Sequence, residues 1–490
     1  MAGHDWTINT LRTSVLSGET TAADVCEDYL ARIDSVDGDL NAFTAVLGES
    51  ARQQAEEVDQ HRDAWRDRPL LGVPVTIKDV ICSKGEPTTG ASRILKGFCS
   101  PYDATVVRKL RDAGAVIIGK TNCDEFAMGS STEHSAYGVT RNPWDRTRIP
   151  GGSSGGAAAA VSARLAPASL ASDTGGSIRQ PAAFCGVVGL KPTYGRVSRY
   201  GLLAFASSLD QIGPMTLTVR DAATVFHTIA GADECDATTS SQPVEDVAQL
   251  GPGDAKGARI GVPRNILEGI DDDVSRSFQA TLGVLTEQGA TLIDIDLPHM
   301  AYAIPVYYLV APAEASSNLA RYDGVRYGHR AAIDAHSDNL ETMYDRTRDE
   351  GFGPEVKRRI MLGTYALSAG YYDAYYVKAQ QVRSLIKSDY DQAFNEVDAV
   401  AMPTTPGPAF RIGEHVDDPL AMYLGDIFTV SANLTGLPAI SVPAGFSEDG
   451  LPIGFQLMGR PFDEATLLRL AAAYEQEAPW WKTRPGDEKR

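Results

Sequence analysis

Two glycine–serine clusters within residues 149–193 carry side chains that could perform nucleophilic catalysis. The first, GGSSGG at residues 151–156, precedes an alanine-rich stretch, and the second, DTGGS at residues 173–177, follows a short apolar run. Glycines have no Cβ, so several backbone N–H groups can point at one spot. A serine beside such a nest could attack a carbonyl carbon while the N–H groups stabilise the developing oxyanion.

Two other interpretations of the first cluster are possible. A phosphate-binding loop requires the spacing G-x-x-x-x-G-K-[ST], but no lysine follows the cluster until Lys191. Residues 152–156, GSSGG, formally match the G-x-S-x-G nucleophile elbow, which must follow a strand. The preceding residues 141–150 contain two prolines and no apolar run, and the eight histidines sit in no supporting motif. Both interpretations are therefore disfavoured.

A lysine offers the base that a serine nucleophile needs. Lys78 follows the apolar run VPVTI at residues 73–77, which predicts a buried strand. A lysine can act as a base only when it is neutral, and burial lowers its pKa because desolvation disfavours the charged form. A second serine hydroxyl could relay the proton between nucleophile and lysine. The joint occurrence of these groups favours a Ser–Ser–Lys arrangement.

These motifs resemble the amidase signature family over nearly the whole chain. The resemblance rests on the strand ending in Lys78, the GGSSGG cluster and the segment DTGGSIRQP, with 24 residues from Ser153 to Ser177. It implies that Ser177 is the nucleophile, Ser153 the bridging serine following a cis peptide, and Lys78 the base. It also implies an oxyanion hole from the N–H groups of Thr174, Gly175, Gly176 and Ser177, and no metal.

Further segments are similar to one branch of this family, the glutaminase (A) subunits of tRNA-dependent amidotransferases. They are residues 126–133, 195–201, 204–214, 314–328 and 350–363. This resemblance implies hydrolysis of glutamine, with Arg359 binding the α-carboxylate, Asp426 the α-ammonium and Tyr307 a further polar group. Arg358 and Arg359 are adjacent on a predicted helix, so only one of them can face the pocket.

The same resemblance implies the partners. The ammonia would pass to a B subunit, which binds charged tRNA and uses ATP and Mg²⁺ to convert Glu-tRNA(Gln), and possibly Asp-tRNA(Asn), to the amide, while a small C subunit braces the pair. No cofactor is expected in this chain. The alternative is a stand-alone amidase for small-molecule amides, which would share Lys78, Ser153 and Ser177 but lack a charged pair for an amino acid.

The elements that must position these groups follow from apolar periodicity. The pattern predicts a strand over 70–80, a helix over 7–36, and helices followed by strands at 104–113 and 115–118, 156–164 and 166–171, 274–289 and 291–297, and 380–397 and 399–402. It ends with strands at 439–442 and 453–458 and a helix at 464–476. Such alternation indicates an α/β fold. With the family resemblance, we expect a large mixed central sheet flanked by helices on both faces. We also expect residues 1–490 to form a single amidase domain with a peripheral lobe at roughly 250–420.

Composition limits the remaining possibilities. The 490 residues include 45 Lys+Arg and 64 Asp+Glu, so the net charge is 45 − 64 = −19. This negative charge argues against nucleic-acid binding over the whole surface, although it is compatible with a local basic patch. Because only about 12 of the basic residues are lysines, we expect adaptation to a salt-rich, halophilic cytoplasm. No secretory signal or membrane-length apolar run is visible, which predicts a cytoplasmic protein that does not bind membranes. The six cysteines form no C-x-x-C pair and are expected to be reduced.

Overall fold

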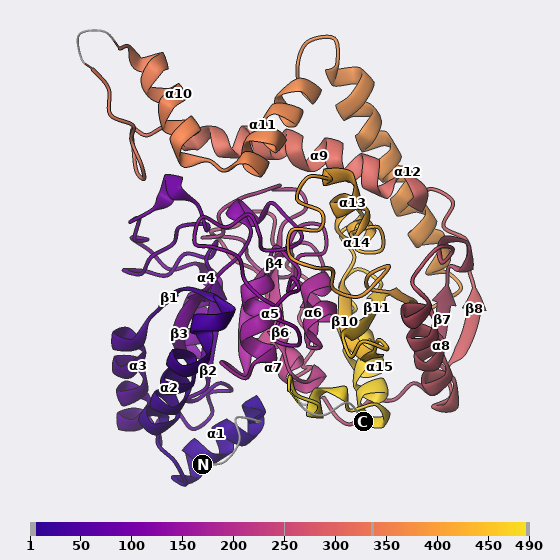
Figure 1. Cartoon of the computed structure of the whole chain (residues 1–490). Helices are drawn as coiled ribbons and strands as arrows, with labels where there is room; N and C mark the ends of the chain where they lie inside the picture. Colours follow the sequence, from indigo (N-terminus) through magenta and orange to yellow (C-terminus); the bar gives the residue numbers. More distant parts are fainter. Residues whose placement is uncertain (1–5, 249, 335–337, 487–490) are drawn as a thin grey trace.

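A computed structural model describes residues 6–248, 250–334 and 338–486. This part of the chain forms one 11-stranded sheet in the order β1-β3-β2-β4-β6-β5-β10-β11-β9-β7-β8 (Figure 1). The strands are β1 (Phe43–Val46), β2 (Pro74–Lys78), β3 (Val116–Thr121), β4 (Ala168–Asp173), β5 (Val188–Lys191), β6 (Gln211–Thr216), β7 (Arg259–Val262), β8 (Thr291–Asp294), β9 (Ala399–Pro403), β10 (Ala439–Phe446) and β11 (Pro452–Gly459).

The sheet is mixed. Strand β2 runs parallel to both of its neighbours, β3 and β4. The ladders from β4 through β6, β5, β10 and β11 to β9 are antiparallel, and β9, β7 and β8 are parallel again. The prediction of an α/β protein with a large mixed sheet is therefore confirmed. The parallel strands β2 and β3 are buried on both faces, which is why they read as apolar runs in the sequence, whereas the parallel strand β8 lies at the edge of the sheet and is partly exposed.

Fifteen α-helices accompany the sheet in the described residues. They are α1 (Ile8–Ser17), α2 (Ala22–Leu40), α3 (Gly48–His61), α4 (Thr105–Asp112), α5 (Gly155–Ser162), α6 (Arg179–Cys185), α7 (Val219–Ile229), α8 (Asp272–Glu287), α9 (Ala303–Asn318), α10 (Leu340–Gly351), α11 (Pro354–Ala366), α12 (Lys378–Ala393), α13 (Pro419–Leu424), α14 (Val430–Thr435) and α15 (Glu464–Glu477). The single helix expected over 7–36 is two helices. The first ends at Gly18, which adopts φ +77°, and Thr21 caps the start of the second.

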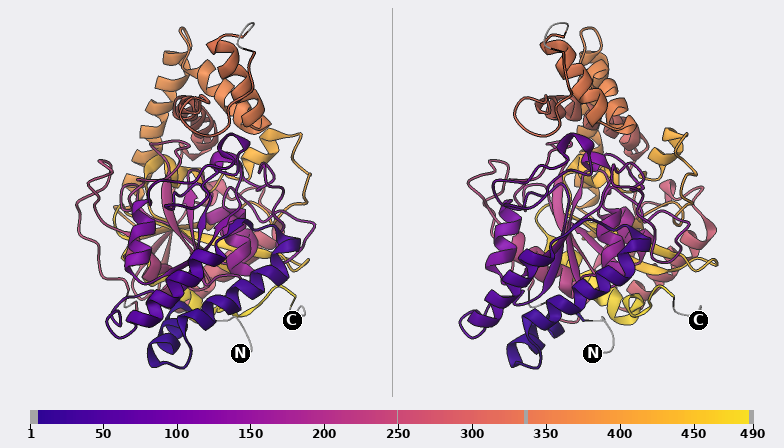
Figure 2. Two further views of the ribbon diagram at one scale, coloured as in Figure 1. Left: turned by 90° about the vertical axis from the view of Figure 1, so that its left-hand side faces the viewer. Right: turned by 60° about the vertical axis from the view of Figure 1, so that its left-hand side comes forward.

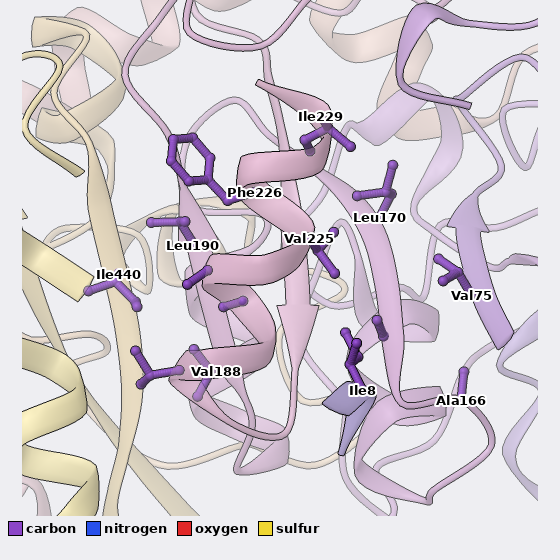
Figure 3. Packing of buried hydrophobic residues seen from close by; sticks show 14 of the residues in the cluster. Ile8, Val75, Ala166, Leu170, Val188, Leu190, Val225, Phe226, Ile229 and Ile440 are labelled. Carbon is purple, nitrogen blue, oxygen red and sulfur yellow. The ribbon is translucent and has the colours of Figure 1, made fainter. Parts of the chain in front are cut away.

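Helices cover both faces of the sheet. On one face, Val225, Phe226 and Ile229 of α7 pack over strand residues such as Leu170 and Leu190 (Figure 3). Helices α8 and α15 extend this layer over β10 and β11. On the other face, α5 and α6 pack against each other and the sheet through small side chains. The sheet is thereby covered on both sides. The loops that follow the strand ends are the parts of the chain that can form a site.

A group of helices lies beyond one end of the sheet. Helices α9, α10, α11 and α12 sit together above the strands in Figure 1, and the two views of Figure 2 show the same group projecting from the body. Within the range 250–420 where we expected a lobe, β7, α8, β8 and β9 belong to the sheet and its covering layer. Helices α9 and α11 pack closely on each other, and α9 also contacts α12 and α14.

Two further predictions concern the chain as a whole. All six cysteines are free thiols, of which Cys99 and Cys235 are exposed and the other four buried. Within the described ranges, no helix combines the length and the apolar character needed to cross a membrane.

Candidate active site

The site is built where two parallel strands end. Strands β2 and β4 pair with Ile77 opposite Leu170, so Lys78 at the end of β2 and Ser172 and Asp173 at the end of β4 lie at the same edge of the sheet. The loop that enters α5 brings residues 151–154 to this edge. Helix α5 approaches closely because it begins with two glycines: a Cβ on Gly156 would lie 2.4 Å from the Asn122 carbonyl oxygen.

Lys78 is the centre of the hydrogen-bond network. Its side chain is fully buried, and its Nζ lies 2.7 Å from Ser153 Oγ, 2.9 Å from Ser154 Oγ and 3.0 Å from Ser172 Oγ. Burial lowers the pKa of Lys78 to about 8, against the opposing effect of buried Cys123 and nearby carboxylates. All three contacts are to neutral hydroxyl groups, so the amine can exist uncharged near neutral pH and accept a proton.

Ser153 and Ser154 both contact the lysine but differ in their other bonds. The Ser154 hydroxyl donates to the Ser172 carbonyl oxygen (3.1 Å), which commits its proton to the backbone. The Ser153 hydroxyl accepts from Lys78 Nζ, and its own proton has no acceptor in the described part of the chain. Ser153 is therefore free to pass a proton onward, whereas Ser154 holds the lysine in place. The peptide bond from Gly152 to Ser153 is cis, as the family resemblance implied.

The loop that carries Ser177 is held by a buried ion pair. Asp173 accepts hydrogen bonds from the Gly176 and Ile178 N–H groups (2.9 and 3.2 Å) and from Arg179 Nε (3.0 Å). Burial alone would raise the pKa of Asp173, but the Arg179 guanidinium outweighs it and holds that pKa at about 2. The carboxylate therefore stays charged and fixes the turn that presents Ser177, which is 8 % exposed.

Gln180 joins the loops of the two serines. Its Oε1 accepts from the Gly152 N–H (2.9 Å), and its Nε2 donates to the Ser130 carbonyl oxygen (2.8 Å). The cis-peptide loop and the turn around Ser177 are thus in direct contact. No hydrogen bond joins the Ser153 and Ser177 hydroxyls within residues 6–248, where both lie. Catalytic hydrogen bonds often tighten only in the substrate complex.

Backbone amides for an oxyanion are present beside Ser177. The N–H groups of Thr174, Gly175 and Ser177 have no acceptor among the described residues. The Gly176 N–H, which we expected to join them, instead donates to the Asp173 carboxylate. We therefore do not include Gly176 among the oxyanion donors: its role is to let the turn form, because it adopts φ +133° and a Cβ there would lie 2.3 Å from Thr429 Oγ1.

Asp426 lies next to this turn. The Thr429 hydroxyl donates to the Gly175 carbonyl oxygen (2.6 Å) and lies 3.0 Å from the Asp426 carbonyl oxygen, so the two backbones are joined through one side chain. The Asp426 carboxylate is 5 % exposed and accepts from Ser130 Oγ (2.6 Å). Burial raises the pKa of Asp426 to about 7. A cation bound here would supply the counter-charge that the carboxylate lacks.

Arg359 and Tyr307 come from the helices above the sheet. Arg359 is buried and its Nε donates to Glu355 Oε1 (2.7 Å), while its Nη atoms have no acceptor in the described part of the chain. The neighbouring Arg358 is 42 % exposed, so Arg359 is the one that points inward. The Tyr307 ring packs on the oxyanion turn: a Cβ on Gly175 would lie 2.6 Å from Tyr307 Oη. Burial raises the pKa of Tyr307, which keeps its hydroxyl neutral.

Several residues of the site escaped the sequence analysis. They are Ser130, Ser172, Asp173, Arg179, Gln180, Glu355, Thr429 and the ring pair of Tyr308 and Tyr423, which stack with centroids 3.7 Å apart beside Arg359. Asp173, Arg179 and Gln180 stand within the DTGGSIRQP segment, where a charged pair six residues apart was the available signal. The described residues contain no group of three or more side chains suited to hold a metal ion.

A mixed sheet, a buried lysine and two serine loops are the features that the resemblance to amidases predicted, and comparison with known proteins shows the same family. The Amidase family model matches residues 24–468. The chain belongs to the amidase family.

Two relatives of this chain within the family carry the same name. The chain is 57 % identical over 484 residues to a protein of Chloroflexus aggregans named as the A subunit of glutamyl-tRNA(Gln) amidotransferase, with 98 % of each chain covered. A crystal structure of the A subunit of glutamyl-tRNA(Gln) amidotransferase from Thermotoga maritima superposes with a TM-score of 0.80 at 46 % identity, covering 98 % of this chain and 96 % of that one. The fold also matches native peptide amidase from Stenotrophomonas maltophilia, with a TM-score of 0.82, 33 % identity and 99 % of each chain covered.

Proposed function

We propose that this chain hydrolyses glutamine and supplies the ammonia to a partner subunit of a tRNA-dependent amidotransferase. The observation that carries the proposal is the position of opposite charges beside one Ser–Ser–Lys network. Asp426 is joined through Thr429 to the turn of Ser177, and the inward-facing Arg359 has free Nη donors. A free amino acid carries both an ammonium and a carboxylate, so this pair suits it better than a neutral amide.

Lys78, Ser153 and Ser177 would then act in sequence. Neutral Lys78 takes the proton of Ser153, which takes that of Ser177, while Ser177 Oγ attacks the carboxamide carbon of glutamine. The oxyanion accepts hydrogen bonds from the free N–H groups of Thr174, Gly175 and Ser177. Collapse of the tetrahedral intermediate returns the proton through Ser153 to the departing nitrogen and releases ammonia. Water then attacks the acyl ester by the same route and releases glutamate, which restores Ser177.

The ends of glutamine would be bound by charge and shape. Arg359 would pair its Nη groups with the α-carboxylate, and Asp426 would accept from the α-ammonium. Tyr307, packed on Gly175, would close the space beside the carboxamide. Glu355 holds Arg359 at its Nε and so fixes the direction of the remaining donors.

The wider assembly is part of the proposal. The relatives are named as A subunits of a glutamyl-tRNA(Gln) amidotransferase. We infer a B subunit that binds Glu-tRNA(Gln), and possibly Asp-tRNA(Asn), and uses ATP and Mg²⁺, together with a small C subunit in a heterotrimer. Such an assembly would work in the cytoplasm, beside the supply of charged tRNA. The acidic, lysine-poor composition supports a cytoplasm that is rich in salt.

Substrate preference of the purified chain separates this function from that of a stand-alone amidase. Both would use Lys78, Ser153 and Ser177. We expect kcat/KM for glutamine to exceed that for propionamide, and Arg359→Gln to lower only the former by about 30-fold or more, because truncating one partner of a buried charged contact costs about 2–5 kcal/mol. Equal kcat/KM for the two substrates, equally reduced by Arg359→Gln, would instead indicate a general amidase.

A further inference from the structure

A second pocket lies outside the Ser–Ser–Lys site. Its volume is about 440 Å³, and its walls include Ser92, Arg93 and Lys96 around a short 3₁₀ turn, Tyr137, and His329 with Glu350. Pockets of 300–1,000 Å³ are of the size that holds a nucleotide or a drug-sized ligand. None of these residues takes part in the hydrolysis proposed above.

The walls are tied together before any ligand binds. The His329 N–H donates to the Ile94 carbonyl oxygen (2.7 Å), and the Ala136 N–H donates to that of Ala91 (2.9 Å). The Ser92 hydroxyl lies 3.3 Å from the Gly351 carbonyl oxygen, next to Glu350. Three segments far apart in the sequence therefore meet at one turn through two backbone hydrogen bonds and one from the Ser92 hydroxyl, which makes the pocket a preformed feature of the fold.

The chemistry of the pocket is that of an anion site with one carboxylate. The side chains of Arg93 and Lys96 are exposed and have no hydrogen bond or ion pair with any described residue. Neither cation is held by a described carboxylate in direct contact, although Arg93 lies near enough to Glu125 to offset part of the rise that burial causes in the pKa of that carboxyl. Arginine and lysine side by side suit phosphate oxygens. Tyr137 and His329 supply ring faces on which a base can stack.

Glu350 adds a hydrogen-bond acceptor opposite these donors. Its Oε2 lies 2.7 Å from His329 Nε2, while its Oε1 has no donor among the described residues. Such an oxygen can accept a hydrogen bond from a ribose 2′-hydroxyl or from a base amino group. We propose that this pocket binds a ribonucleotide unit, with its phosphate on Arg93 and Lys96, its base against Tyr137 or His329, and a donor group on Glu350.

The pocket is connected to the helix that carries Arg359. The Ser92 hydroxyl donates to Glu125 Oε1 (2.5 Å), and Glu125 Oε2 accepts from the Gly353 N–H (2.8 Å), the residue before α11. A ligand that contacts residues 92–96 would therefore stabilise the start of α11 and, through it, the position of Arg359. This coupling rests on the proposed function, whereas binding to the pocket does not.

Binding to the full-length chain tests the site directly, with adenosine monophosphate by calorimetry and a fluorescent single-stranded oligoribonucleotide by anisotropy. We expect saturable binding of at least one probe; mononucleotide alone indicates a free nucleotide as the ligand, and the oligomer indicates an RNA segment. The double variant Arg93→Gln/Lys96→Gln should weaken binding by at least 10-fold. For the oligomer, it should also reduce the slope of log K against log[KCl] by up to about 1.4, at roughly 0.7 per phosphate contact.

A matched control removes two exposed cations elsewhere, Arg108→Gln/Lys256→Gln. It should leave binding unchanged, and both double variants should hydrolyse glutamine without ligand as the unaltered chain does. Absence of saturable binding by both probes, or equal weakening by the two double variants, would overturn the site. Because binding is measured without turnover, a chain that binds the probe but prefers propionamide would refute the proposed function and leave the pocket intact.

Discussion

The pH dependence of hydrolysis should differ between glutamine and an uncharged amide. In the proposed function Lys78 acts as the base only when neutral, and burial lowers its pKa to about 8 from the usual 10.5. At pH 7 the neutral fraction is then about 9 %, against about 0.03 % for an unperturbed lysine. Burial therefore raises the reactive fraction about 300-fold, equivalent to about 3 kcal/mol. For any amide, activity should rise with pH and level off above 8.

Glutamine should show a second ionisation. In the proposed function Asp426 binds the α-ammonium only as a carboxylate, and burial raises its pKa to about 7. The active form has Lys78 neutral and Asp426 charged, so the two fractions are multiplied. For glutamine, kcat/KM should then increase about 500-fold from pH 6 to pH 8. For propionamide, which has no ammonium for Asp426 to bind, the increase should be about 50-fold. Asp210, whose pKa burial raises to about 6, holds Thr174 and should affect both substrates alike.

Ammonia release from both substrates between pH 5.5 and 8.5 gives the two profiles. Asp426→Asn is the matched variant, because it keeps the side-chain shape and removes the charge. Its glutamine profile should fall to the 50-fold rise of the amide. A flat profile, or one that falls with rising pH, would refute Lys78 as the base. Equal rises for the two substrates in the unaltered chain would refute the role of Asp426.

Four other predictions test the remaining parts of the site. Ser177→Ala should abolish glutamine hydrolysis in a folded protein, measured as ammonia release, whereas full activity would exclude Ser177 as nucleophile. Ser153→Ala should lower kcat by orders of magnitude and Ser154→Ala by less, because the Ser154 proton is committed to Ser172; the reverse order would assign the relay to Ser154. The melting temperature should rise from 0.1 M to 2 M KCl as cations screen the charge of −19, and a flat or falling value would make the acidic bias incidental. With B and C subunits and charged tRNA, glutamine hydrolysis should accelerate, and Ser177→Ala should still allow tRNA amidation from added ammonium; an assembled, tRNA-bound complex unable to use ammonium would contradict the division of labour.

The sequence predicted local features better than contacts between distant segments. The run before Lys78 and the alternation of helices and strands predicted the strands at the site, because buried parallel strands leave continuous apolar runs. The helix break at Gly18 was missed, since its flanking residues fit one helical pattern. The prediction that the Gly176 N–H is an oxyanion donor failed for another reason. Whether a backbone N–H is free depends on the neighbouring carboxylate, and Asp173 reaches it only because the turn folds back.

Contacts across long separations in the chain could not be derived from spacing. Ser130 meets Asp426 over 296 residues, and Thr429 meets Gly175 over 254. Family resemblance supplied Arg359 and Asp426, but not what holds them. Helical geometry explains why Arg359 and Glu355 pair, because residues four apart share one face. It does not say which face is inside; that depends on how α11 packs on α9.

The distribution of counter-charge explains how one small site holds both a carboxylate that stays charged and a lysine whose pKa is lowered to about 8. Asp173 has a guanidinium in direct contact, so its charge survives burial and its oxygens can hold the turn of Ser177. Lys78 is equally buried, but its three direct partners are hydroxyl groups. The carboxylates around it favour the ammonium less than burial disfavours it. Because Arg179 satisfies Asp173, that carboxylate has no need of the lysine as its counter-ion. The ion pair at Arg179 therefore does more than fix a loop: it keeps the Asp173 carboxylate out of hydrogen-bond contact with Lys78, so that burial can lower the pKa of the amine as the proposed base requires.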